Sequence, residues 1–167
     1  SVYDAAGRLK ASTDSAVQPT EYEYDDAGRQ TAVVDALRKR TETEYNAGGQ
    51  RKLARNALRR ETKFDYDALG RLVKTTFPDL TFTSTGYNTV GQRVSETDQS
   101  TLTRDFEYDV SGRLTAVVLP KALDPETNTL VRPRYEYKYD RYGNQATIKD
   151  PKGRETTFSY DERNRQV

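Results

Sequence analysis

The chain has 167 residues, of which 34% are hydrophobic and 32% charged, and its net charge is +1. This balance gives no bulk attraction to nucleic acid or to a membrane surface, and the lack of cysteine excludes disulfides and thiolate sites. The sequence also lacks histidine and any apolar run long enough to span a bilayer, so we expect no membrane span, no catalysis, no cofactor and no metal.

A tyrosine-containing motif recurs along the whole chain with a period of 21 residues. The copies begin at Tyr3, Tyr24, Tyr45, Tyr66, Tyr87, Tyr108, Tyr139 and Tyr160. They read YDAAGR, YDDAGR, YNAGGQ, YDALGR, YNTVGQ, YDVSGR, YDRYGN and YDERNR. We therefore expect residues 1–167 to form a single tandem array of about eight units.

Each motif predicts a tight turn between two strands. Asp or Asn after the tyrosine can bond to the backbone two residues on, and glycine three positions later tolerates the left-handed conformation. Asparagine is the residue that best replaces glycine there. The predicted turn residues are Asp4, Gly7, Asp25, Gly28, Gly49, Asp67, Gly70, Gly91, Asp109, Gly112, Asp140, Gly143 and Asn164.

Alternation of aromatic and polar residues predicts a strand before each turn, at 20–24, 62–66, 104–108 and 156–160. A second strand follows each turn, at 30–35, 71–77 and 113–119. Residues two apart share a face of a strand. One side of the sheet should therefore carry Tyr22, Tyr24, Phe64, Tyr66, Phe106, Tyr108, Tyr137, Tyr139, Phe158 and Tyr160.

A second turn is expected where the second strand ends, at Asp14, Asp35, Asn56, Asp98 or Asp150. It is clearest in DPKGR at 150–154, because proline after Asp presets a turn. Two antiparallel strands per unit, with turns at both edges, give an all-β antiparallel meander of β-hairpin repeats. Since sheets twist, this meander should form a curved or spiral sheet.

Residues 38–63 form a basic stretch and are the best local candidate for anion binding. The side chains could hold an anionic cargo, a polysaccharide or an adjoining acidic wall. A solvated sheet face with cross-strand ion pairs is the favoured alternative. The candidate residues are Arg38, Lys39, Arg40, Arg51, Lys52, Arg55, Arg59 and Arg60.

An insertion interrupts the array in the sixth unit. The step from Tyr108 to Tyr139 is 31 residues, so ten extra residues lie within 119–134, a stretch that contains Pro120, Pro125 and Pro133. Loops tolerate such additions at little cost in stability and also carry functional contacts. The sequence is compatible with a loop that has no function of its own, and equally with a loop that contacts cargo, a lid or a partner.

The YDxxGR signature at this period resembles the YD repeats of the Rhs (rearrangement hotspot) family, which also occur in Tc toxin B and C components and in teneurins. The resemblance covers nearly the whole chain. It implies a spiral β-sheet that forms part of a hollow shell, which in bacterial toxins encloses a toxic C-terminal region. Toxin members also carry an aspartyl protease with a DPxGL-type motif. DPKGR at 150–154 has Arg154 in place of the leucine and fits an ordinary turn.

The resemblance implies a scaffold that encloses or presents a toxin or other polypeptide cargo, and recurrence of the motif acids in the turns favours a non-catalytic role. The alternative is a carbohydrate-binding or cell-surface adhesion module, because tyrosine-rich faces can stack on sugar rings. We expect a fragment of a longer array, from a bacterial secreted or cell-surface protein whose signal lies elsewhere. Its partners would be the remaining repeats of the parent, the enclosed polypeptide or a glycan, and the incomplete terminal hairpins could also drive self-association.

Overall fold

The computed structural model describes residues 1–13 and 18–167, so the expected turn at Asp14 lies outside the described residues. The described residues contain 17 β-strands and no helix. Consecutive strands run antiparallel, which confirms the predicted all-β antiparallel meander. The chain divides into two compact units, Ser1–Phe82 and Thr83–Val167, each with four copies of the tyrosine motif.

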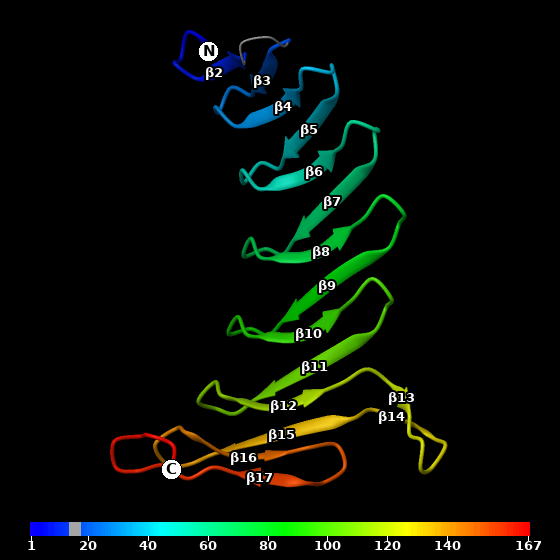
Figure 1. Cartoon of the computed structure of the whole chain (residues 1–167), viewed down its shortest axis with the longest axis vertical. Helices are drawn as coiled ribbons and strands as arrows, with labels where there is room; N and C mark the ends of the chain where they lie inside the picture. The colour runs from blue at the N-terminus through cyan, green and yellow to red at the C-terminus, as the bar shows by residue number, and fades with distance from the viewer. Residues whose placement is uncertain (14–17) are drawn as a thin grey trace. The chain divides into compact units, whose positions relative to one another are not determined.

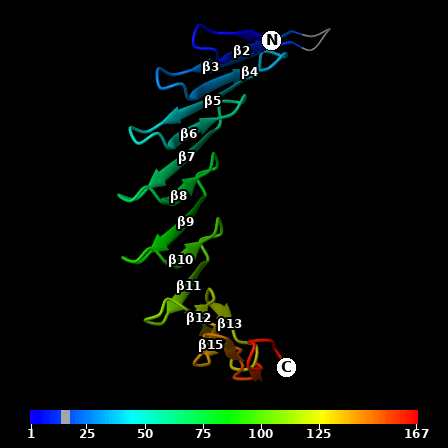
Figure 2. The same ribbon diagram turned by 90° about the vertical axis from the view of Figure 1, so that its left-hand side faces the viewer.

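The first unit is a meander in which each strand pairs with the next (Figure 1). In both views no other element covers the strands β3 to β8, so this unit is a single layer (Figures 1 and 2). Its strands are β1 (Val2–Tyr3), β2 (Leu9–Ser12), β3 (Thr20–Tyr24), β4 (Gln30–Val34), β5 (Arg40–Tyr45), β6 (Arg51–Arg55), β7 (Glu61–Tyr66) and β8 (Leu72–Thr76).

The second unit continues the same pattern, with β12 pairing to β15 across the insertion. Strand β9 (Phe82–Tyr87) begins at the last residue of the first unit. The strands that follow are β10 (Arg93–Thr97), β11 (Thr103–Tyr108), β12 (Leu114–Val118), β15 (Arg134–Tyr139), β16 (Gln145–Lys149) and β17 (Glu155–Thr157). The insertion forms its own two-stranded hairpin from β13 (Ala122–Leu123) and β14 (Leu130–Val131).

The last predicted strand, 156–160, is shorter in the structure. Strand β17 ends at Thr157, and Tyr160 makes an isolated bridge to Gln166 instead. The N–H of Phe158 still donates to the carbonyl of Ala146, so the chain stays beside β16 beyond the strand's end. The paired strand therefore ends before Phe158 and Tyr160, the two aromatic residues that the sequence pattern predicted to lie within it.

Only small or medium apolar side chains are buried among the described residues: Ala32, Val34, Leu53 and Ala116. All four lie on the face opposite to the aromatic residues. In β4, for example, Ala32 is paired with Glu23, whereas its neighbour Val33 is paired with Tyr22. The ten aromatic side chains predicted for that face are half-buried, as expected for a one-layer sheet that covers its rings only with neighbouring side chains.

Candidate functional site: the turns and the charged face

The first turn of each unit is closed by the motif's own acid and arginine. In the second 21-residue repeat, which begins at Tyr24, the N–H of Gly28 donates to the carbonyl of Asp25, and the N–H of Asp25 donates to the carbonyl of Arg29. One carboxylate oxygen of Asp25 accepts the N–H of Arg29, and the other accepts its Nε at 2.7 Å. The acid thus holds both the backbone and the side chain of the arginine.

The turn glycines adopt the left-handed conformation that the motif requires. Their φ angles lie between 77° and 90°, and Asn164 takes the same position at 57°. Where Asn replaces the acid, as at Asn46, its side chain bonds to the backbone N–H and the side chain of Gln50. The same turn is therefore made from a charged pair or from two amides.

Motif tyrosines connect their own repeat to the repeat before it. The Tyr45 hydroxyl donates to the carbonyl of Gln30, fifteen residues earlier, at 2.9 Å. Tyr139 does the same across the insertion, donating to the carbonyl of Leu114 at 2.7 Å. Equivalent bonds are made by Tyr24, Tyr66, Tyr108 and Tyr160. The tyrosine is thus an inter-repeat contact.

The motif arginine reaches in the other direction, to the following unit. The Arg8 guanidinium lies over the Tyr24 ring, 4.9 Å from its centroid, and donates to the carbonyl of Asp25. Arg29 over Tyr45 and Arg113 over Tyr139 repeat the stacking at 4.7 and 4.8 Å. A cation over an aromatic face is attractive, so turn closure and the joining of repeats share one side chain.

Two units place the arginine one residue later. In these units Gln50 and Gln92 occupy the usual arginine position, and their amides donate to the carbonyls of Gly70 and Gly112. The arginine that follows stacks on a phenylalanine of the next unit instead, Arg51 on Phe64 at 4.6 Å and Arg93 on Phe106 at 4.7 Å. The inter-repeat stacking is kept, with a different aromatic partner.

The second turns have the same hydrogen-bond geometry as the first, which the sequence pattern did not predict. At Asp35 the N–H donates to the carbonyl of Lys39, and Arg38 takes the left-handed position with φ 63°. Most second turns fill that position with a residue other than glycine. Besides Arg38 these are Arg59, Leu80 and Thr101.

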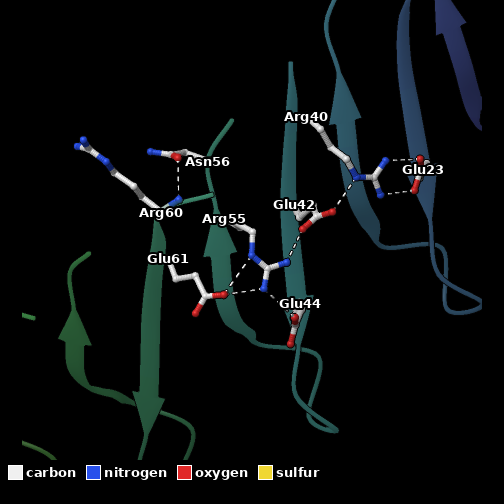
Figure 3. Close-up of polar contacts among 8 residues, drawn as sticks. All are labelled: Glu23, Arg40, Glu42, Glu44, Arg55, Asn56, Arg60 and Glu61. Carbon is white, nitrogen blue, oxygen red and sulfur yellow. Dashed lines mark hydrogen bonds and ion pairs between the residues drawn. The ribbon is translucent and has the colours of Figure 1, made fainter. Parts of the chain in front are cut away.

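A chain of ion pairs crosses one face of the first unit (Figure 3). Arg40 binds both oxygens of Glu23, at 2.5 and 2.8 Å, and donates its Nε to Glu42. Arg55 continues the chain from Glu42 to Glu61. The hydrogen bonds from Arg40 and then Arg55 hold the pKa of Glu42 below its ordinary value. The arginine and glutamate charges therefore neutralise one another across neighbouring strands.

This charged face depends on a small residue in the strand between the acids. Ala32 in β4 is paired with Glu23 on one side and with Glu42 on the other, and Arg40 bridges these acids. The compact unit Thr83–Val167 has the same arrangement. Ala116, 0% exposed, is paired with Glu107 and Glu136, which Arg134 bridges.

The basic residues expected to bind anions are thus in several different environments. Arg40 and Arg55 are bound to glutamates, Arg38 pairs with Glu21, and Lys52 lies 3.7 Å from Glu44. Arg51 stacks on Phe64. Within the part of the chain that the structure describes, no ion pair involves Lys39, Arg59 or Arg60. These three residues lie in the second turns. Anion binding by residues 38–63 would therefore depend on the edge of the sheet that carries the second turns.

The DPKGR segment has the geometry of the other turns. Asp150 accepts the N–H groups of Lys152 and Arg154 and the Nε of Arg154, and Gly153 has φ 83°. Among the described residues, no group of three potential metal ligands is brought together. No helix in that part of the chain is long and apolar enough to cross a membrane.

Comparison with known proteins matches the repeat at three places. The family model described as RHS Repeat matches residues 3–40, 87–122 and 139–167, more than half of the chain. No curated protein matches the sequence.

The whole chain also superposes on solved structures. The TcdB2-TccC3-Cdc42 structure and TcdB2-TccC3 without its hypervariable C-terminal region each match with a TM-score of 0.66 and 22% identity. The Tc holotoxin pore of Photorhabdus luminescens matches with a TM-score of 0.64 and 22% identity. All of this chain is covered in each case, but only 10% of those chains, so it spans about one tenth of their length. At this identity the likeness concerns the fold.

Proposed function

Because the chain belongs to the RHS repeat family, we propose that it is a wall segment that encloses or presents another polypeptide and performs no catalysis itself. The observation that carries this proposal is the use of the motif residues. The tyrosine hydroxyl, the acid and the arginine all bond within the array, as at Asp25, Arg29 and Tyr45. A motif repeated in every unit and used for joining units suits a wall more than a single reactive centre.

The same contacts weigh against the carbohydrate-binding alternative. Sugar rings bind by stacking on an open aromatic face, but an arginine covers one face of the Tyr24, Tyr45 and Tyr139 rings. The hydroxyls of these tyrosines already donate to backbone carbonyls. A glycan-array measurement separates the two functions. Saturable binding to one glycan, lost on replacing exposed tyrosines, would support the adhesion module.

The wall function is tested by limited proteolysis of the full-length parent protein. We expect one segment outside the repeats to resist trypsin while the array is folded and to be cut once the array is unfolded by urea. A parent in which every segment outside the repeats is cut equally fast under native conditions would contradict enclosure. The proposal includes a bacterial secreted or cell-surface location for the parent.

The partners that we propose are further repeats and the enclosed polypeptide. At the edge of the second unit, β17 pairs with β16 and its three residues are exposed. An open strand edge can accept another strand, from a following repeat or from a second copy of the chain. Analytical ultracentrifugation of the 167-residue chain should show concentration-dependent association. A monomer at all concentrations, with protected amides in β17, would contradict strand addition.

A further inference from the structure

The insertion hairpin and the turn between β16 and β17 enclose a cleft in the second unit. Both lie at the same edge of the sheet (Figure 1), and the volume between them is about 880 Å³. That volume lies within the range of about 300–1,000 Å³ typical of ligand sites. Leu123, Val131, Pro133 and Pro151 contribute apolar lining. At the cleft, Lys152 in the turn forms an ion pair with Glu126 in the hairpin at 3.1 Å.

One cationic residue in the lining, Lys149, differs from its counterpart in the first unit. Lys149 is paired across the sheet with Glu136 and Glu155, just as Arg55 is paired with Glu42 and Glu61. Arg55 binds both of its acids. Lys149 forms no ion pair with either of its acids. The chain of charges that is closed in the first unit is therefore left open beside the insertion.

The other charged side chains that line the cleft already have partners. Arg134 is bound to Glu107 and Glu136, and Arg132 to Asp105. Arg154 pairs with Asp150, while Asp124 accepts the N–H of Glu126 at the hairpin's own turn. Among the lining residues, all of which the structure describes, Lys149 has the one charged group that forms no ion pair or side-chain hydrogen bond. An incoming ligand would thus meet one available ammonium group and apolar walls.

We propose that this cleft binds an extended polypeptide segment, which places one carboxylate on Lys149 and an adjacent apolar side chain against Leu123 and Pro133. A single cation suits a carboxylate, and the leucine, valine and proline side chains suit aliphatic neighbours. No aromatic residue lines the cleft, so it lacks the stacking surface that a sugar would need. The site goes beyond the wall function and does not depend on it.

The test is a titration of the isotope-labelled 167-residue chain followed by NMR of its backbone amides. The probe is the peptide acetyl-Ser-Leu-Glu-Leu-Ser-amide, and the matched neutral probe has Gln in place of Glu. We expect saturable shifts at Leu123, Lys149 and Lys152 with the acidic peptide. The neutral peptide should bind about tenfold more weakly, because a charge-assisted bond is lost. Equal shifts with both peptides would overturn the proposal.

Three variants make the test specific. Lys149→Gln should reduce binding of the acidic peptide about tenfold. Lys138→Gln is the control, because it removes the same charge from the neighbouring strand β15 outside the cleft lining, and it should bind normally. Lys149→Arg keeps the charge but should also bind weakly, because the guanidinium would bridge Glu136 and Glu155 as Arg55 bridges its acids.

Each variant also has an outcome that contradicts the proposal. Unchanged binding by Lys149→Gln, with a spectrum that shows an intact fold, would exclude Lys149 as the anchor. Equal loss in Lys138→Gln would indicate a diffuse charge effect. Full binding by Lys149→Arg would contradict the role given to an unbridged cation.

Discussion

The hydroxyl of Tyr108 donates a hydrogen bond of 2.9 Å to the carbonyl of Arg93, fifteen residues earlier in the chain. It joins the end of β11 to the start of β10, which belongs to the preceding unit. The bond therefore adds to the ladder between these strands at the point where the strands enter their turns.

Replacing Tyr108 by Phe should lower the free energy of unfolding by about 0.5–1.5 kcal/mol, because one inter-repeat hydrogen bond is lost while the ring remains. Urea denaturation measures the change. The matched control is Tyr142→Phe, since that hydroxyl contacts only the neighbouring Arg141 within the described part of the chain. Equal stability of the two variants would show that the inter-repeat bond contributes nothing.

Replacing Ala116 by Leu should lower the free energy of unfolding by about 1–3 kcal/mol, because a larger side chain must displace its neighbours at a buried position. Ala116 lies between Glu107 and Glu136, which Arg134 bridges. The control is Ala27→Leu in an exposed turn, where the fourth unit already has Leu69 at the equivalent position. Thermal unfolding compares them, and an unaffected Ala116→Leu would contradict the packing requirement.

Replacing Gly70 by Val should destabilise the chain by about 1–2 kcal/mol, because a β-branched residue is strained at φ 79°. Gly70→Asn should be milder, since Asn164 occupies the same position in the last unit. Urea denaturation of both variants measures the difference. Equal stability of the two would argue against a left-handed Gly70.

Introducing glycine at a left-handed position of a second turn is expected to stabilise the chain. Thr101 is exposed and has φ 62°, so Thr101→Gly should raise the free energy of unfolding by up to about 1 kcal/mol. Thr13→Gly, at an exposed residue outside this set of left-handed positions, is the control and should not stabilise. A destabilised Thr101→Gly, measured by thermal unfolding, would show that relief of strain does not outweigh the flexibility of glycine.

Acid should weaken the turns through residues such as Asp109. The backbone N–H of Arg113 and then its side chain hold the pKa of Asp109 below the ordinary 3.8. The folded form therefore takes up this proton at lower pH than the unfolded form. The stabilisation is fully present above pH 3.8 and is lost as the pH falls below that value through the pKa of the folded chain.

The variant Asp109→Asn tests this pH dependence, because Asn46 and Asn88 occupy the same position in other units. Unfolding free energies measured from pH 7 to pH 2 should fall less steeply for this variant than for the original chain. Identical slopes for the variant and the original chain would remove Asp109 from the acid response.

The 21-residue period was sufficient to predict the all-β antiparallel meander, because tyrosine, acid and glycine carry strong local signals. The second turns were less visible: Leu80 and Thr101 have left-handed backbones that neither residue favours. At Thr101, the antiparallel pairing of β10 with β11 on either side of the turn fixes the conformation. The prediction from sequence reached the fold but not this equivalence of the two turns.

The charged face could not be derived from sequence because its partners are set by strand register. Arg40 meets Glu23, seventeen residues away, and counting charges along residues 38–63 cannot reveal that pair. The same limit applies to Lys149, whose lack of a partner becomes evident only by comparison with Arg55. The break in period indicated an insertion within 119–134. The cleft could not be predicted in this way, because it depends on where the hairpin β13–β14 lies relative to β16 and β17.

The two forms of stacking imply that the repeats are not freely interchangeable modules. A unit with arginine in the motif offers a cation to the tyrosine that follows, as Arg29 does to Tyr45. A unit that carries Gln50 and Arg51 offers it to Phe64 instead. Shuffling units by recombination would preserve every hairpin and yet separate such pairs. The order of the repeats along the chain is therefore constrained by the arginine–aromatic contacts between consecutive repeats, in addition to the contacts within each repeat.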